Sequence, residues 1–134
     1  MAARSVQPDG WPDPKGYSNG MTGQGRLLAV AGQIGWDASG TLHKGFLAQW
    51  EQALVNVATV VRTAGGTLED ILSLTIYVVD KREYLDDPKA VGAAYRKIMG
   101  RHFPAMALVQ VTALVEDDAR VEIQALAALP MGGA

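Results

Sequence analysis

Glu122 is the residue best suited to acid–base chemistry. It alternates with Gln124 and Leu126 in an apolar stretch of the sequence, so these three side chains share one face of a strand. An apolar setting disfavours the charged form of a carboxyl group and suits it to act as a general acid, or as a base that positions water. The alternative is an ordinary carboxylate at a strand edge, either solvated or held in an ion pair.

A second group of residues offers the walls and polar contacts of a binding site. Gly32 and Gln33 follow an apolar run and present backbone groups, although a glycine in a strand is also typical of a bulge or a close backbone approach. Apolar and aromatic walls with an amide suit a flat or hydrophobic ligand that lacks a carboxylate. Internal packing is the alternative for each wall candidate: Trp36, Tyr77, Met106, Leu108 and Gln110. Gln124, on the same strand face as Glu122, is a further candidate for substrate binding.

Several other kinds of site have no pattern in the sequence. The chain has no cysteine, which excludes a disulfide framework, a thiolate metal site and a cysteine nucleophile. His43 and His102 lack partners at metal-ligand spacing, so we expect no metal. Since neither a phosphate loop nor a dinucleotide fingerprint is present, we also expect no cofactor. A net charge of −2 argues against a nucleic-acid partner, because binding the phosphate backbone needs clustered Lys and Arg.

Composition predicts a single domain with a covered surface. The 134 residues match the commonest domain size, and no window approaches the roughly 18–20 apolar residues of a membrane span. Residues 1–15 have no apolar signal-peptide core, so we expect a cytoplasmic protein without a membrane partner. Hydrophobic residues make up 49% of the chain and charged ones only 19%, below the usual ~25%. A small monomer would struggle to cover this apolar surface, so we expect a subunit interface.

Periodicity predicts the elements that must position these residues. Alternating or β-branched runs predict strands at residues 17–24, 27–34, 71–79, 105–111 and 120–129. Apolar residues at three- and four-residue steps predict helices at residues 45–64 and 88–99. The resulting order, ββαβαββ with the first two strands as a hairpin, predicts an α+β fold with two helices on one face of a mixed sheet. Residues 1–15 form an extended arm before a domain at residues 16–130.

Alternation within the last two strands assigns each side chain to a face of the sheet. One apolar set is expected to face the helices: Ala107, Val109, Val111, Val121, Ile123 and Ala125. The opposite set is half apolar and half polar: Met106, Leu108, Gln110, Glu122, Gln124 and Leu126. We expect another subunit to cover this second face.

Several segments resemble the reactive intermediate deaminase (Rid, or YjgF) family. The matching segments are residues 16–18, 29–34, 52–57, 64–66, 68–71, 75–80, 103–105 and 121–125. The resemblance runs from Tyr17 to Leu129 and implies a chorismate-mutase-like fold in a barrel-forming homotrimer, with a ligand cleft at each subunit boundary. It also implies cofactor-independent hydrolysis of small reactive imines and enamines to keto acids and ammonia.

The resemblance implies roles for residues at matching positions. Glu122 matches the family's pocket glutamate, and Gly32 matches a glycine whose backbone contacts the substrate. Tyr17 would cap the pocket of a neighbouring subunit, with edge packing as the alternative. The family's central arginine clamps the substrate carboxylate, and Met106 stands at its position. A thioether can neither donate to a carboxylate nor neutralise it.

Two further positions depart from the family, and two arginines are candidates for the missing cation. Gly92 stands at an asparagine-like position and Ala31 at a serine position. Arg120 shares the parity of Glu122, and Arg101 precedes the strand that contains Met106. Surface ion pairing is the alternative for both arginines.

The sequence therefore predicts a homotrimeric hydrolase or deaminase with Glu122 as its acid/base group. One such carboxyl group can hold the attacking water and move a proton to the leaving nitrogen of an imine, an enamine or a similarly activated small molecule. A non-catalytic ligand-binding or interaction module of the same fold is the second hypothesis, because the missing arginine also fits a loss of catalysis. Ribonuclease activity, a third possibility, conflicts with the acidic charge balance.

Overall fold

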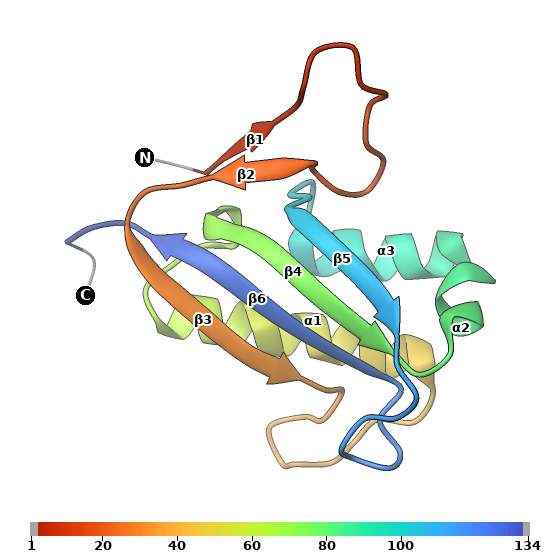
Figure 1. Cartoon of the computed structure of the whole chain (residues 1–134). Helices are drawn as coiled ribbons and strands as arrows, with labels where there is room; N and C mark the ends of the chain where they lie inside the picture. Colours follow the sequence, from red (N-terminus) through yellow and green to blue (C-terminus); the bar gives the residue numbers. More distant parts are fainter. Residues whose placement is uncertain (1–2, 133–134) are drawn as a thin grey trace.

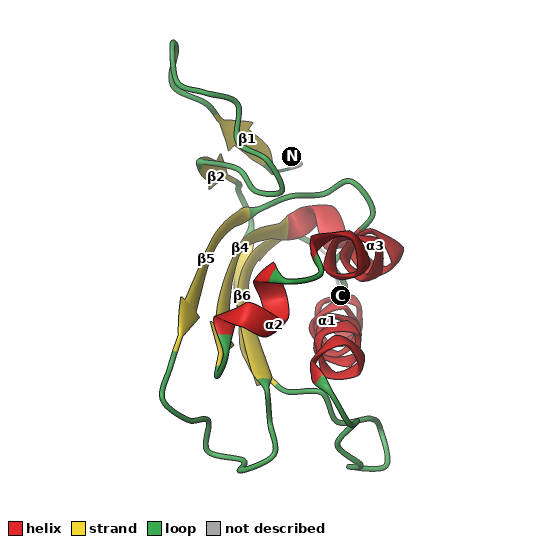
Figure 2. Cartoon of the chain, turned by 90° about the vertical axis from the view of Figure 1, so that its right-hand side faces the viewer, coloured by secondary structure: helices red, strands yellow, loops and turns green. Residues whose placement is uncertain are grey.

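A mixed four-stranded sheet carries two long helices on one face in the computed structural model, which describes residues 3–132 (Figures 1 and 2). The strand order is β3-β6-β4-β5; β6 is antiparallel to both of its neighbours, and β4 is parallel to β5. This arrangement confirms the predicted α+β fold. The elements are β3 (Arg26–Gln33), α1 (Phe46–Thr63), η1 (Leu68–Asp70), β4 (Ile71–Val78), α2 (Lys81–Leu85), α3 (Pro88–Met99), β5 (Ala105–Gln110) and β6 (Val121–Leu129).

The core lies between the sheet and the two long helices. The inward side chains of β4, for example Leu74 and Ile76, are fully buried in the core, together with Leu54 and Val57 of α1. Trp50 of α1 is 2% exposed, and its indole N–H donates to the backbone oxygen of Val91 in α3 at 3.2 Å. This bond ties the two helices together at the same place where they cover the sheet. Among the described residues, no helix has the length and apolar character needed to cross a bilayer.

The predicted hairpin between residues 17–24 and 27–34 is wrong. β2 (Gly20–Thr22) pairs instead with β1 (Arg4–Val6) within residues 1–15, and the two strands form a separate ribbon above the main sheet (Figure 1). The connection explains this change of direction. Gly25 has a φ of 143°, and a Cβ atom there would lie 2.7 Å from the carbonyl carbon of Leu129. The chain therefore passes tightly over the end of β6 and does not turn back along β3.

The predicted faces are correct for β6 and wrong for β5. In the parallel register, Met106 pairs with Leu74 and Leu108 pairs with Ile76. Because paired residues share a face, Met106 and Leu108 point toward the helices, where they pack against the core. In β5 the odd-numbered and the even-numbered side chains are both mainly apolar, so the sequence pattern does not show which set faces the helices. The longer Met106 and Leu108 lie on the helix side of the sheet, and the smaller Ala107 lies on the opposite face.

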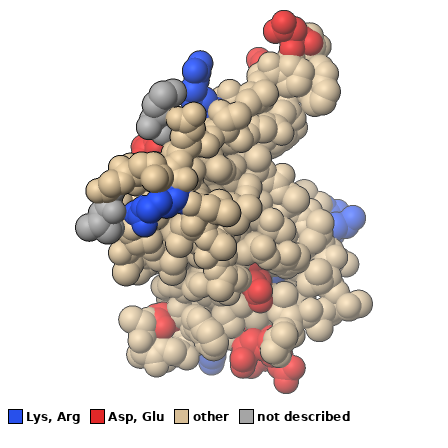
Figure 3. Space-filling view, turned by 60° about the vertical axis from the view of Figure 1, so that its left-hand side comes forward, with Lys and Arg blue, Asp and Glu red and all other residues tan. Residues whose placement is uncertain are grey.

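The sheet face away from the helices exposes apolar side chains. Leu27 is 72% exposed, Val109 44% and Leu126 42%, and their register places all three on this face, which we call the open face. Figure 3 shows a broad surface with few charged side chains on the side nearest β3. An apolar patch of this kind is typical of an interaction surface, and it is where the predicted subunit interface would lie.

Candidate active site

Glu122 lies against the backbone of β3 at a β-bulge. Relative to β6, β3 has one extra residue between Val30 and Gln33, which bends the strand around Gly32. A Cβ atom on Gly32 would lie only 2.7 Å from Cδ of Glu122. The bulge and the close approach, both typical of a strand glycine, are therefore present, and a side chain at position 32 would displace this carboxyl group.

The Glu122 carboxylate is half-buried on the open face. Within residues 3–132 it has no ion-pair partner, and no protein group donates a hydrogen bond to it. The ion-paired edge carboxylate considered from sequence is therefore not what the structure contains. The group is available to a water molecule or a ligand.

Two polar side chains stand beside Glu122 on the same face. Tyr77 lies directly across from Glu122 between β4 and β6, and its hydroxyl donates to Oε1 of Gln124 at 2.9 Å. This bond fixes the orientation of the Gln124 amide and of the Tyr77 ring. Gly32, Tyr77 and Gln124 thus lie around the Glu122 carboxyl group. Gln33 folds back instead, and its amide donates to Ala31 O at 3.1 Å.

A cavity of about 280 Å³ lies between α3, α2, the first turns of α1 and the start of β5. We call it the α3 pocket; its walls are mainly aromatic and apolar, and they include Trp50, Tyr84, Tyr95, Phe103 and Met106. Tyr95 stacks on Phe103 with ring centroids 5.3 Å apart, and its hydroxyl donates to His102 O at 2.6 Å. Burial raises the pKa of both Tyr84 and Tyr95, so both hydroxyls remain neutral. The aromatic part of the wall is thus preorganised and uncharged.

The structure does not bring all the predicted wall residues to Glu122. Met106 lines the α3 pocket on the helix side of the sheet, so its predicted place beside Glu122 on one face is wrong, as are those of Leu108 and Gln110. Leu108 packs against the core, and Gln110 accepts the backbone N–H of Lys81 at 2.9 Å.

Two aromatic candidates lie in loops. Tyr17 is 41% exposed and borders a second hollow, with Ser73 and Thr75 on the open face. Trp36 follows β3 and is held through its backbone oxygen by the Asn56 amide at 2.8 Å. Any role of Tyr17 or Trp36 in binding stays a prediction.

Of the other candidates, Arg101 is exposed and does not line the α3 pocket, whereas Arg120, His102 and His43 are held in structural contacts. Arg120 donates to Oε1 of Glu83 through Nε at 2.9 Å and Nη2 at 2.7 Å, which is the ion pairing considered from sequence. The His102 ring lies 2.8 Å from Ile71 O, and His43 lies 3.6 Å from an Asp37 carboxylate oxygen. No group of three His, Asp or Glu side chains within residues 3–132 has the arrangement of a metal site.

Arg96 is the charged residue of the α3 pocket, and no pattern in the sequence pointed to it. It lies on α3 four residues after Gly92, and both residues line the pocket. The sequence shows that Gly92 and Arg96 are one helical turn apart. It does not show that they border a pocket, because the opposite wall comes from β5 and the loop before it, and only the fold brings these segments together.

A family model described as Endoribonuclease L-PSP matches residues 12–129. The chain belongs to the Rid/YjgF family. A 2-iminobutanoate/2-iminopropanoate deaminase from Capra hircus is 35% identical over 104 residues, which cover 76% of this chain and 72% of that protein. A protein of the same name from Salmonella typhimurium is 35% identical, with 77% and 80% covered.

Solved structures of Rid proteins share this fold. The Rid-family protein YyfB from Yersinia pestis superposes with a TM-score of 0.82 at 31% identity, and 96% of this chain and 100% of that chain are covered. The YjgF gene product of E. coli gives a TM-score of 0.66 at 30% identity, with 93% and 98% covered. The relatives named as imine deaminases support an imine deaminase-like function within the family.

Proposed function

We propose that this Rid protein hydrolyses a small reactive imine or enamine in clefts between the subunits of a cytoplasmic homotrimer, without a cofactor. The observation that carries the proposal is the Glu122 carboxylate, which has no partner among the described residues and is held against the backbone of Gly32. The deaminases among the relatives support the reaction class.

In the proposed reaction, Glu122 first acts as a base. It takes a proton from a water molecule while the water oxygen bonds to the imine carbon, and the C=N bond becomes a single bond. The protonated Glu122 then returns this proton to nitrogen, which gives a neutral carbinolamine. In the second stage Glu122 takes the hydroxyl proton of the carbinolamine and passes it to the amino nitrogen, so that the C–N bond breaks and ammonia leaves as the carbonyl forms. One imine and one water thus give one carbonyl compound and one ammonia. The carboxyl group ends in its starting state, as a general acid–base catalyst must.

The geometry of a single chain supports a site shared between subunits. Glu122 lies on the open face, whereas the side chain of Met106 lies in the α3 pocket on the helix side of the same sheet. A small substrate bound in the α3 pocket would therefore reach the Glu122 of a second copy rather than that of its own chain. The exposed Leu27 and Leu126 on the open face support its burial against such a copy.

The direct test is a hydrolysis assay. Imines of small amino acids, generated in the assay by an amino-acid oxidase, hydrolyse spontaneously, and we expect the protein to accelerate ammonia release above that background. Light scattering in the same buffer is expected to give a mass near three times 14.2 kDa. Ammonia release at the spontaneous rate with every imine tested would refute the catalytic proposal.

A binding module without catalysis is the second candidate. The observation that favours it is Met106 at the position of the family's clamping arginine, in a formed and largely apolar pocket. A ligand that binds the α3 pocket without being consumed would support this candidate.

Substituting Gly32 by alanine is expected to lower kcat for imine hydrolysis by about 10- to 100-fold, because the new Cβ atom would displace the Glu122 carboxyl group. The measurement is steady-state ammonia release, with thermal unfolding followed in parallel. The matched control is Gly20→Ala in β2, where a Cβ atom would meet only Val6 Cβ, at an ordinary 3.6 Å. Equal activity of Gly32→Ala and Gly20→Ala would contradict the role assigned to the bulge.

A further inference from the structure

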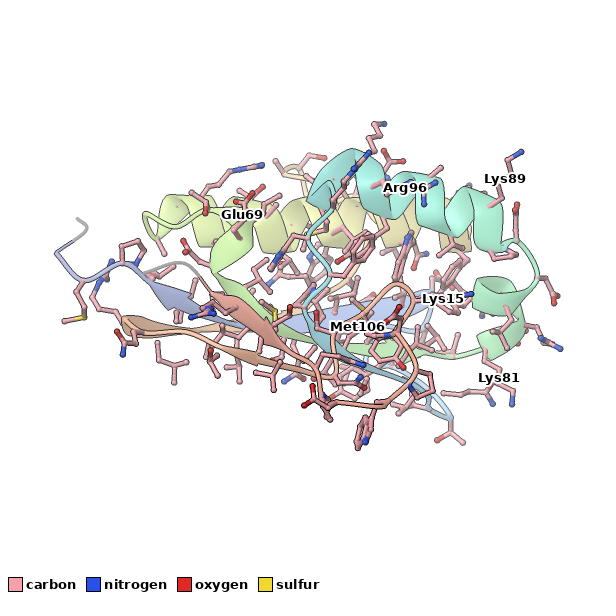
Figure 4. All side chains as sticks on the ribbon, turned by 90° about the horizontal axis from the view of Figure 1, so that it is seen from above. Lys15, Glu69, Lys81, Lys89, Arg96 and Met106 are labelled. Carbon is pink, nitrogen blue, oxygen red and sulfur yellow. The ribbon has the colours of Figure 1, made fainter. Side chains whose placement is uncertain are left out.

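Arg96 folds back along α3 over Gly92. Its Nη1 lies 3.1 Å, and its Cζ 3.9 Å, from the point where a Cβ atom of Gly92 would stand. Long side chains on a helix point toward its N-terminus, and here the absence of a side chain at Gly92 leaves space for the guanidinium at the pocket wall. Figure 4 shows Arg96 on α3 and Met106 on β5, the two elements that border the α3 pocket.

The Arg96 guanidinium has no anionic partner among the described residues, since none of their carboxylates lies within 4.0 Å of it. Nearby cations differ in this respect. Lys97, the next residue on α3, pairs with Glu51, and Arg120 pairs with Glu83 at 2.7 Å. A position in the last turn of α3 favours a cation through the helix dipole. That alone does not explain why this side chain lies along the pocket.

The remaining walls of the pocket define the kind of ligand that Arg96 would bind. Trp50, Tyr84, Phe103 and Met106 offer rings and a thioether, which suit an apolar body. A volume of about 280 Å³ is just below the range of about 300–1,000 Å³ that is common for ligand cavities, so a small ligand fits best. A guanidinium at one wall of such a cavity matches the planar, two-oxygen geometry of a carboxylate.

We propose that Arg96 binds the carboxylate of a small ligand whose apolar side chain fills the α3 pocket. Arg96 on α3, beside Gly92, thus provides the positive charge that is missing at position 106 on β5. This assignment rests on the proposed function for the reaction, whereas binding of the carboxylate does not depend on turnover.

Calorimetric titration with a matched pair of probes tests the assignment. The wild-type protein is expected to bind 3-phenylpropanoate about 10- to 100-fold more tightly than the neutral 3-phenylpropanamide, because a charged hydrogen-bond pair is lost with the amide. Arg96→Met is expected to abolish this preference. The matched control is Arg101→Met, which removes the same charge from an exposed residue outside the pocket wall and is expected to leave both affinities unchanged within about twofold.

A second variant separates the site from a general charge effect. The double substitution Arg96→Met with Met106→Arg returns a guanidinium to the pocket from β5 and is expected to restore a preference for the carboxylate. Three results would overturn the assignment: no binding of 3-phenylpropanoate to the wild type, an unchanged preference in Arg96→Met, or equal losses in Arg96→Met and Arg101→Met.

The outcomes also separate this inference from the proposed function. If the carboxylate preference depends on Arg96 but no imine is hydrolysed, the proposed function fails and the Arg96 site stands. If imines of apolar amino acids are hydrolysed and Arg96→Met leaves their KM unchanged, the Arg96 assignment fails and the catalytic proposal stands.

Discussion

Replacing Glu122 with glutamine is expected to lower kcat for imine hydrolysis by about 10²- to 10⁴-fold, the usual contribution of a general acid–base group. An amide of the same size still fits against Gly32, but it cannot take a proton from water. Because the carboxylate has no partner among the described residues, the variant is expected to unfold within a few degrees of the wild type. Steady-state ammonia release is the measurement.

The matched control for this substitution is Glu116→Gln, which removes one carboxylate from the exposed loop between β5 and β6. It is expected to leave kcat unchanged. A Glu122→Gln protein that is folded and as active as Glu116→Gln would show that Glu122 does not move the proton.

Replacing Trp50 with alanine is expected to lower the free energy of unfolding by about 3–5 kcal/mol, as large-to-small core substitutions do. Trp50 is 2% exposed, stacks with Phe46 at 6.1 Å and meets Tyr84 edge-on at 5.7 Å. The variant also removes the hydrogen bond to Val91 O and one wall of the α3 pocket. Urea denaturation followed by circular dichroism measures the change.

Trp11 provides the matched control, since it is 58% exposed in the N-terminal segment. Trp11→Ala is expected to change the free energy of unfolding by less than about 0.5 kcal/mol. Similar effects of Trp50→Ala and Trp11→Ala would contradict the packing described for α1.

The sequence predicted correctly those elements whose residue pattern is compatible with only one assignment of bounds or faces. α3 begins and ends where expected, with Pro88 first and the Asp87 side chain accepting Ala90 N–H at 3.2 Å. The faces of β6 were also correct, because its inward side chains are apolar and Glu122 and Gln124 are not. The pattern failed in β5, where both faces are apolar, and at residues 17–24, where β2 is three residues long and local sequence does not select the partner strand.

Part of the candidate site followed from sequence, and part did not. Gly32 and Glu122 were selected separately, and the register of β3 with β6 brings them together. The pairing of Arg120 with Glu83 joins residues 37 positions apart, and such a contact leaves no local pattern. Arg96 was missed for the same reason, because its significance depends on a pocket wall contributed by Met106.

The central claim is that Glu122 of one subunit acts on a substrate held in the α3 pocket of another, and subunit mixing tests it directly. Glu122→Gln lacks the acid, and Gly92→Trp fills the pocket; each variant alone is expected to be inactive. Equal amounts unfolded and refolded together are expected to regain about one quarter of wild-type ammonia release, because about one boundary in four then combines an intact acid with an intact pocket. Mixed oligomers with no more activity than the separate variants would contradict the claim.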